Sequence, residues 1–283
     1  MTVRPFRFAV NLATTDTVAT WQDKCRRAED LGYDTITVSD YLDRQSPFLA
    51  LAAAAAATTR PKVGTYVLNG GFYNPALLAR DVVAVQQLSG GRLELGIGTG
   101  YAKADFEAAD IPWPSVSARV SHLERVVTDV RKLAGDHAPP VLIGGNGSRV
   151  LALAARDADI VSTTGARSRT ERGKPEVVDH AALSARMAAV RSAAADRVED
   201  VELNLLVHVV KVTDDADGGL GFLRGYADHV PEADLPKLPT LLSGTPRAIA
   251  DQLLAAREGM GFSYFTVLEP MMADFAKVIS VLS

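Results

Sequence analysis

Two glycine-rich segments have a spacing that would let a ligand approach the backbone closely. The first, Gly144-Gly145-Asn146-Gly147, separates an apolar run from a helical pattern that starts at Ser148. Glycines at such a junction leave backbone N–H groups open to an anion, and the helix N-terminus adds a favourable potential. Turns between a strand and a helix also use glycine for its left-handed backbone alone. A phosphate site and a purely structural turn are therefore both open here.

The second segment, Gly96-Ile97-Gly98-Thr99-Gly100, would let a flat ring or a phosphate lie against a strand end, with the Thr99 hydroxyl as a donor. Its Gly-x-Gly-x-Gly spacing differs from the Gly-x-Gly-x-x-Gly of nicotinamide-binding domains. No ribose-binding acid follows a second strand at the expected distance either. The sequence therefore disfavours a Rossmann dinucleotide site.

Other side chains carry fewer chemical signals. Asp40 and Tyr41 end an apolar run, where the carboxylate would either cap a turn or contact a polar ligand. The five histidines lack the spacing with Cys, Asp or Glu that is typical of metal ligands, so no metal is predicted. His208 lies inside a long apolar run and is interpreted as an interior polar residue. No Gly-x-Ser-x-Gly nucleophile elbow is present.

The elements that must position these residues alternate along the chain. Apolar runs predict strands at 7–12, 34–39, 62–68, 92–97, 140–143, 159–162, 201–212 and 264–268. Helical spacing predicts helices at 16–31, 48–58, 75–88, 115–133, 148–156, 177–197, 247–257 and 273–282. Strands separated by helices pair in parallel, and eight such units are typical of a (β/α)8 TIM barrel. We predict one barrel domain over residues 1–283, with a doubly wound open sheet as the alternative.

Composition excludes several other classes. The 283 residues are 47 % hydrophobic and 23 % charged, which is ordinary for a globular protein. The net charge of −4 offers no basic footprint for nucleic acid. No run approaches the ~20 apolar residues of a membrane span. The single cysteine, Cys25, lies on the apolar stripe of the first helix and fits a reducing compartment. We expect a cytoplasmic protein that binds a small molecule.

Longer motifs resemble a known family. In order along the chain they are LGYDTITVSD at 31–40, NPALLAR at 74–80, LSGGRLELGIGTG at 88–100, PVLIGGNG at 140–147 and GTP at 244–246. Together they resemble the bacterial luciferase-like, flavin-dependent barrel family. Within that family the chain is most similar to an actinobacterial branch that uses the deazaflavin coenzyme F420. The run at 88–100 is the most specific of these motifs.

The resemblance implies hydride transfer at C5 of coenzyme F420, with the ring bound at the barrel mouth. Asp40 would contact the ring, and a non-proline cis peptide between Tyr66 and Val67 would support it from behind. The other residues that the family would use for the coenzyme are Gly98, Thr99 and Gly100 along the ring and Gly144, Gly145, Asn146 and Gly147 at the phosphate. Family members commonly dimerise, so a homodimer is expected.

Two positions depart from the family pattern. Many members have a histidine where this chain has Tyr41, and sugar-phosphate and alcohol dehydrogenases have a glutamate where it has Tyr101. Alcohol oxidation by the usual route is therefore not expected. Because an ordinary phenol, with a pKa of about 10, can donate a proton, we hypothesise reduction of an activated C=C or C=N bond. Tyr101 or Tyr41 would donate the proton, or both rings would merely wall the coenzyme.

Two further functions stay open at this level. One is an FMN-dependent monooxygenase of the same fold, and the other is a non-catalytic member that binds the coenzyme or a partner. The loops at the barrel mouth set the substrate, and their sequences do not identify it.

Overall fold

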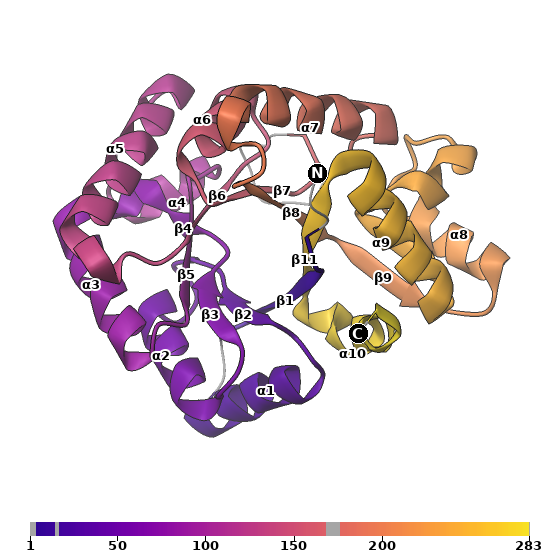
Figure 1. Ribbon diagram of the computed structural model, residues 1–283, viewed down its shortest axis with the longest axis horizontal. Coiled ribbons are helices and arrows are strands. Elements are labelled where there is room, and N and C mark those ends of the chain that lie inside the picture. The colour runs from indigo at the N-terminus through magenta and orange to yellow at the C-terminus, as the bar shows by residue number, and fades with distance from the viewer. Residues whose placement is uncertain (1–3, 15–16, 168–175, 283) are drawn as a thin grey trace.

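The computed structural model describes residues 4–14, 17–167 and 176–282. In this part of the chain eight parallel strands close into a barrel that helices surround (Figure 1). The barrel strands are β1 (Arg7–Leu12), β2 (Thr35–Val38), β3 (Lys62–Thr65), β5 (Leu93–Gly98), β6 (Val141–Gly144), β7 (Ile160–Thr163), β8 (Glu202–Val207) and β11 (Phe262–Leu268). Their order is β3-β2-β1-β11-β8-β7-β6-β5, and pairing of β3 with β5 closes the ring. The predicted (β/α)8 barrel is confirmed, and the open-sheet alternative is wrong.

The surrounding helices follow the predicted alternation. They are α1 (Val18–Asp30), α2 (Pro47–Ala57), α3 (Pro75–Leu88), α5 (Val116–Ala134), α6 (Ser148–Asp157), α7 (His180–Ala194), α9 (Pro246–Met260) and α10 (Met272–Leu282). The side chain of Thr17 caps α1, and Asp16, where the sequence predicted the start of this helix, lies outside the described residues. The short helix α4 (Lys103–Ala108) lacks a periodic signal and was not predicted. The helix α8 (Ala216–Arg224) lies in the irregular Asp-, Gly- and Pro-rich stretch after residue 212, where the sequence indicates helical pieces without definite bounds.

Two predicted strands are interrupted in the structure. The run at 62–68 splits into β3 and the two-residue β4 (Leu68–Asn69), with the cis peptide between Tyr66 and Val67 separating them. The run at 201–212 was expected to be the longest strand, but β8 ends at Val207. The backbone N–H of His208 donates to the carbonyl of Thr240 at 2.8 Å, which takes the chain out of the barrel. The remainder, β9 (Val209–Val212), pairs with the unpredicted β10 (Leu241–Gly244).

The arginine of the most specific motif has a structural role. The Arg92 guanidinium donates to the carbonyls of Ala55 and Thr58, at 2.7 and 3.1 Å, and to that of Pro61 at 2.9 Å. These carbonyls lie at and just beyond the C-terminus of α2, where a helix leaves acceptors unsatisfied and attracts positive charge. Arg92 therefore fastens the alanine-rich helix α2 to the start of β5.

A charged cluster closes the amino end of the barrel. Arg7 contacts Glu94 at 2.7 Å and also pairs with Glu202, and the Tyr264 hydroxyl donates to Glu94 at 2.8 Å. The Arg7 guanidinium lies 4.2 Å above the Tyr264 ring. Because the side chains of Glu94 and Glu202 are almost completely buried, each depends on these partners for compensation of its charge.

The main hydrophobic core joins the barrel strands to the surrounding helices, and a second cluster lies around β9, β10 and α8. The main cluster includes members of every barrel strand and of α1, α2, α3, α5, α6, α7, α9 and α10. Cys25 is part of it, as expected, and burial raises the pKa of its thiol to about 12. None of the helices in the described ranges is long and apolar enough to cross a membrane. That residues 1–283 form a single domain stays a prediction.

The charged cluster gives a test of the fold. Replacing the buried Glu94 by Gln leaves the partly buried Arg7 with one carboxylate instead of two, so we expect the free energy of unfolding to fall by about 3 kcal/mol. The exposed, helix-surface pair Lys103–Glu107 supplies the control. The variant Glu107→Gln should change stability by less than about 0.5 kcal/mol. Urea denaturation followed by circular dichroism measures both, and equal losses in the two variants would contradict this account.

Candidate active site at the barrel mouth

A cavity of about 860 Å³ opens at the carboxyl ends of the barrel strands, within the size range of cofactor sites. All twelve residues singled out from the sequence line it: Asp40, Tyr41, Tyr66, Val67, Gly98, Thr99, Gly100, Tyr101, Gly144, Gly145, Asn146 and Gly147. They come from several different strand ends. The barrel topology therefore brings together segments that lie far apart in the sequence, while the role of each residue stays a prediction.

The floor of the cavity is built around the side chain of Val67. A Cβ atom placed on Gly98 or Gly144 would lie 3.1 or 3.0 Å from the Val67 methyl groups, and one on Gly96 would lie 1.9 Å from the Thr65 carbonyl oxygen. Only glycine leaves room for the chain between Thr65 and Val67 at these positions. The result is a surface of backbone and one branched side chain, which suits contact with a flat ring.

Tyr66 lies beside Val67 but directs its hydroxyl into the barrel. That oxygen is 2.9 Å from the Ser162 hydroxyl and donates to Asn204 Oδ1 at 3.0 Å. The Asn204 amide in turn donates to the Thr266 hydroxyl at 2.9 Å. Burial raises the pKa of the Tyr66 phenol to about 12. Tyr66 is therefore a protonated anchor of the floor, whose hydroxyl is occupied by the barrel interior.

Asp40 organises the loop that follows β3. Its Oδ2 accepts hydrogen bonds from the backbone N–H of Asn69 at 3.0 Å and from the Tyr73 hydroxyl at 3.1 Å. Burial raises the pKa of the Asp40 carboxyl, these two donors oppose that effect, and the nearby Asp105 adds to it. The two interpretations of Asp40 are thus compatible, because a carboxyl that holds this loop also lines the cavity. Tyr73 had no signal in the sequence that linked it to Asp40.

The glycine-rich loop before α6 is not a left-handed turn. Gly147, the residue before the helix, has a φ of −79° and offers no side-chain cap, and neither Gly144 nor Gly145 has a positive φ. At Gly145 a Cβ would lie 2.3 Å from Val150, so close packing explains that glycine. The first backbone N–H groups of α6 consequently lie at the cavity without a capping side chain, which is the arrangement that favours an anion.

Asn146 fixes this loop to the neighbouring strand. Its Oδ1 accepts from the Thr163 hydroxyl at 2.8 Å and from the Thr164 backbone N–H at 3.1 Å, and its Nδ2 donates to the Thr164 hydroxyl at 2.8 Å. The side chain of Asn146 is therefore used for positioning.

Three arginines that sequence reasoning did not identify line the cavity: Arg119, Arg149 and Arg167, of which Arg167 pairs with Glu176. Arg149 lies in the first turn of α6, beside the glycine-rich loop. Arg119, on α5, is only 8 % exposed, and its guanidinium lies 3.7 Å above the Trp113 ring and donates to the Pro114 carbonyl. Its Nε has no hydrogen-bond partner within the described chain, and burial lowers the pKa of the group. The sequence did hold a signal for Arg119, because this arginine lies on the otherwise apolar face of the helix that carries Val116, Val120 and Leu123.

The two candidate proton donors lie in different surroundings. Tyr41 is half-buried after β2, whereas Tyr101 is 42 % exposed after β5. Between β5 and Tyr101, Gly100 has a φ of 68°, and a Cβ there would lie 2.3 Å from Asn69. The Thr99 hydroxyl donates to the Gly100 carbonyl at 3.3 Å, so its proton is used within this turn.

His208 also lines the cavity. The sequence interpretation placed it inside a strand as an interior polar residue and did not assign it to the site. Its Nε2 lies 2.8 Å from the Thr164 carbonyl oxygen. Burial lowers the pKa of the imidazole and this hydrogen bond raises it, with burial the larger effect. The ring is therefore neutral near pH 7. Among the described residues, no group of His, Cys, Asp and Glu side chains is arranged to hold a metal ion.

Several named proteins are similar to this chain. An F420-dependent glucose-6-phosphate dehydrogenase of Intrasporangium calvum is 38 % identical over 122 residues, which are 39 % of this chain and 36 % of that relative. A 5,10-methylenetetrahydromethanopterin reductase of Methanolobus tindarius is 28 % identical over 172 residues, which are 54 % of this chain and 52 % of that protein. The chain thus spans about a third to a half of the length of these relatives.

Solved structures share the fold over nearly the whole chain. An F420-dependent secondary alcohol dehydrogenase in complex with an F420-acetone adduct superposes with a TM-score of 0.76 at 17 % identity, covering 99 % of this chain and all of that one. The long-chain alkane monooxygenase LadA gives a TM-score of 0.77 at 13 % identity, covering 100 % and 92 %. At such identities the likeness shows the fold alone.

The family model for luciferase-like monooxygenases matches residues 1–264, which include every strand of the barrel up to the first part of β11. The five motifs, the cis peptide and the glycine-lined floor all lie within this match. The chain therefore belongs to the luciferase-like monooxygenase family.

Proposed function

We propose that the protein is an oxidoreductase that binds coenzyme F420 at the barrel mouth and reduces an activated C=C or C=N bond of a small organic substrate. The observation that carries this proposal is the 860 Å³ cavity, which all twelve predicted coenzyme and proton-donor residues line. The F420-dependent relatives support the choice of coenzyme.

The residues present fit such a coenzyme at both of its ends. The floor of Val67, Gly98 and Gly144 offers the flat contact that a tricyclic ring requires. The uncapped N-terminus of α6 and the guanidinium groups of Arg119 and Arg149 offer positive charge for a phosphate and a carboxylate-bearing tail. The unpartnered Nε of Arg119 is explained if a bound anion completes its hydrogen bonds.

When bound, reduced F420 supplies a hydride from C5 of its deazaflavin ring. This chain then has to hold the acceptor above the floor and deliver a proton. The hydride adds to one atom of the C=C or C=N bond, the two π electrons take up a proton at the other atom, and the phenol that donates this proton recovers one from water. Tyr41 and Tyr101 are the groups at the mouth with the chemistry to do so.

An FMN-dependent monooxygenase is the second candidate, because monooxygenases share this fold closely. The cationic wall favours the deazaflavin, whose side chain carries more negative charge than that of FMN. A non-catalytic coenzyme-binding member is the third candidate, motivated by the tyrosines at positions 41 and 101. A homodimer and a cytoplasmic location stay predictions.

The coenzyme assignment is tested by titration of the purified protein with F420 and with FMN, followed by fluorescence. We expect one site with at least tenfold tighter binding of F420. Replacing Arg119 by Gln removes a buried positive charge from the cavity wall and should weaken F420 binding about tenfold or more. Lys132→Gln, on the exposed surface of the same helix α5, is the matched control and should have no effect. Tighter binding of FMN, or equal affinities of the two variants, would refute the assignment.

The proton-donor hypothesis is tested with Tyr41→Phe and Tyr101→Phe. Loss of a general acid lowers a chemical step by about 10²–10⁴-fold. We therefore expect single-turnover reduction to slow by at least 100-fold in one variant, with its F420 affinity within threefold of the wild type. A donor also gives a solvent isotope effect that the phenylalanine variant loses. Unchanged rates in both variants would eliminate this role for the tyrosines.

A further inference from the structure

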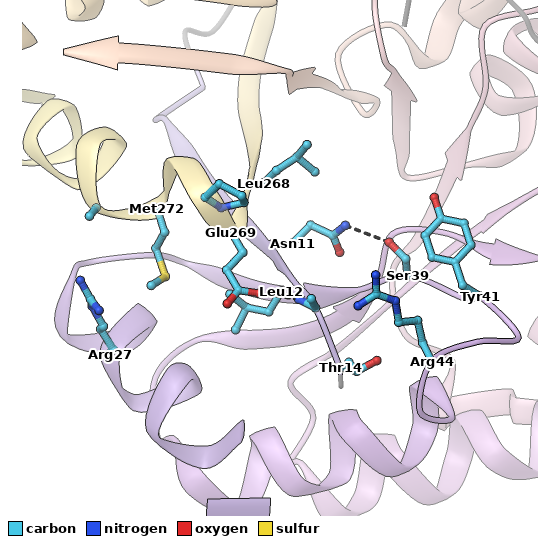
Figure 2. Close-up of a pocket in the computed structure, with 13 residues that line it drawn as sticks. Asn11, Leu12, Thr14, Arg27, Ser39, Tyr41, Arg44, Leu268, Glu269 and Met272 are labelled. Carbon is cyan, nitrogen blue, oxygen red and sulfur yellow. Dashed lines mark hydrogen bonds between the residues drawn. The ribbon is translucent and has the colours of Figure 1, made fainter. Parts of the chain in front are cut away.

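A second cavity of about 560 Å³ lies beside the coenzyme cavity, between β1, α1 and the 3₁₀ turn η5 (Glu269–Met271) (Figure 2). We call it the side cavity. Four residues line both cavities: Asn11, Ser39, Tyr41 and Leu268. The two spaces therefore meet at these residues, which we call the junction. Beyond the junction, the walls of the side cavity include Leu12, Thr14, Arg27, Arg44, Glu269 and Met272.

The charge in the side cavity is positive. Glu269 is its acidic side chain, and both carboxylate oxygens are occupied: Oε1 lies 2.7 Å from Lys24 Nζ, and Oε2 accepts from the Ala13 backbone N–H at 2.8 Å. Arg27 and Arg44 have no carboxylate within ion-pair distance among the residues that the structure describes. Among the described residues, two guanidinium groups without an ion-pair partner thus face the side cavity, while Lys24 already balances the charge of its Glu269 carboxylate.

A buried hydroxyl also lacks a partner there. Thr14 is 2 % exposed, lines the side cavity, and its Oγ1 forms no hydrogen bond within the described chain. Leaving a buried hydroxyl unpaired is unfavourable, which points to a ligand that supplies the missing partner. In Figure 2 Thr14 and Arg44 lie on the same side of the cavity, and the Arg44 guanidinium points toward Asn11 and Ser39.

The junction is held in place from below. Asn11 Nδ2 donates to the Ser39 hydroxyl at 2.9 Å, and that hydroxyl donates to the Tyr66 carbonyl at 3.1 Å. The junction is thereby tied to the floor on which the ring would lie. Of the two candidate proton donors, Tyr41 lines both cavities, whereas Tyr101 lines the coenzyme cavity and not the side cavity.

We propose that the side cavity is the acceptor-substrate site and that it selects a small organic anion. The carboxylate or phosphate group of the substrate binds to the Arg44 guanidinium and the Thr14 hydroxyl. Its reducible bond lies at the junction, where Tyr41, rather than Tyr101, faces it. This inference rests on the proposed function for the identity of the reaction, but the anion site itself stands on the cavity, the neutralised acid and the unpartnered hydroxyl.

The anion site is tested without coenzyme. The probe is 4-bromobenzoate, whose bromine is located by anomalous scattering in soaked crystals and whose affinity is measured by calorimetry. We expect bromine in the side cavity and affinity reduced at least tenfold in Arg44→Gln and about threefold or more in Thr14→Val. Thr14→Ser, which keeps the hydroxyl, should bind as the wild type does. Bromine found only in the coenzyme cavity, or an affinity that Arg44→Gln leaves unchanged, would overturn the proposal.

A matched control and a second probe sharpen this result. Arg26→Gln removes an arginine of the same helix as Arg27, one that is exposed, paired with Asp23 and absent from the cavity wall. Its affinity for the probe should equal that of the wild type. Competition by inorganic phosphate distinguishes the two headgroups. If phosphate displaces bromobenzoate at phosphate concentrations below the dissociation constant of bromobenzoate, the substrate carries a phosphate group. If higher phosphate concentrations are needed, the substrate carries a carboxylate.

The F420 affinity of Arg44→Gln separates this inference from the proposed function. We expect it to lie within threefold of the wild type, because Arg44 lines the side cavity and not the coenzyme cavity. A tenfold loss would mean that the side cavity holds part of the coenzyme, and this inference would fail while the proposed function stood. The opposite result is also distinguishable. If the protein does not bind F420 but binds bromobenzoate in a manner that depends on Arg44, the anion site stands and the proposed function fails. In single turnover, Tyr41→Phe and not Tyr101→Phe should lose the fast step.

Discussion

The close approach of Val67 to three glycines, Gly96, Gly98 and Gly144, is the contact on which the barrel mouth depends. With a Cβ at Gly96, the Thr65 carbonyl would have to move, and β3 could not end where it does. The break after β3 carries the chain to Asn69, whose N–H is fixed by Asp40. Floor, loop and carboxyl therefore form one unit, whose parts come from β2, β3, β5 and β6.

Below that floor the barrel holds two layers of polar side chains, together with a small apolar cluster that includes Ala9, Leu142 and Ile160. The upper layer joins Tyr66, Ser162, Asn204 and Thr266 by hydrogen bonds, and the lower one pairs Arg7 with Glu94 and Glu202. Each group is satisfied by side chains of other strands, so the layers tie together strands that lie across the barrel from one another as well as neighbouring strands. They also give Tyr66 a fixed position, and through the Ser39 hydrogen bond to its carbonyl they extend to the junction between the two cavities.

The fold, and the gathering of the candidate site residues around one cavity, were predictable because both follow from local patterns and one topological rule. Alternating strand and helix signals predict the barrel, and the carboxyl-end rule then gathers Asp40, Tyr101 and Gly147 at one mouth. The features that were missed depend on contacts distant in sequence. The exit of the chain at His208 is set by Thr240, and the charge of Arg119 matters because α5 faces the cavity. The side cavity is formed by β1, α1 and η5 together, so no single segment of the sequence could indicate it.

The attachment of Arg92 to the end of α2 bears on how relatives of this chain should be sorted. The motif around Arg92 is the most recognisable stretch of the sequence, yet its arginine holds a helix and lines neither cavity. Searches of genomes with that motif will collect chains with this scaffold whatever reaction they perform. In contrast to Arg92, the residues at positions 14, 41, 44 and 101 line the two cavities. Because we propose that the substrate binds at these cavities, grouping the collected chains by those four positions is the division that should follow the substrate.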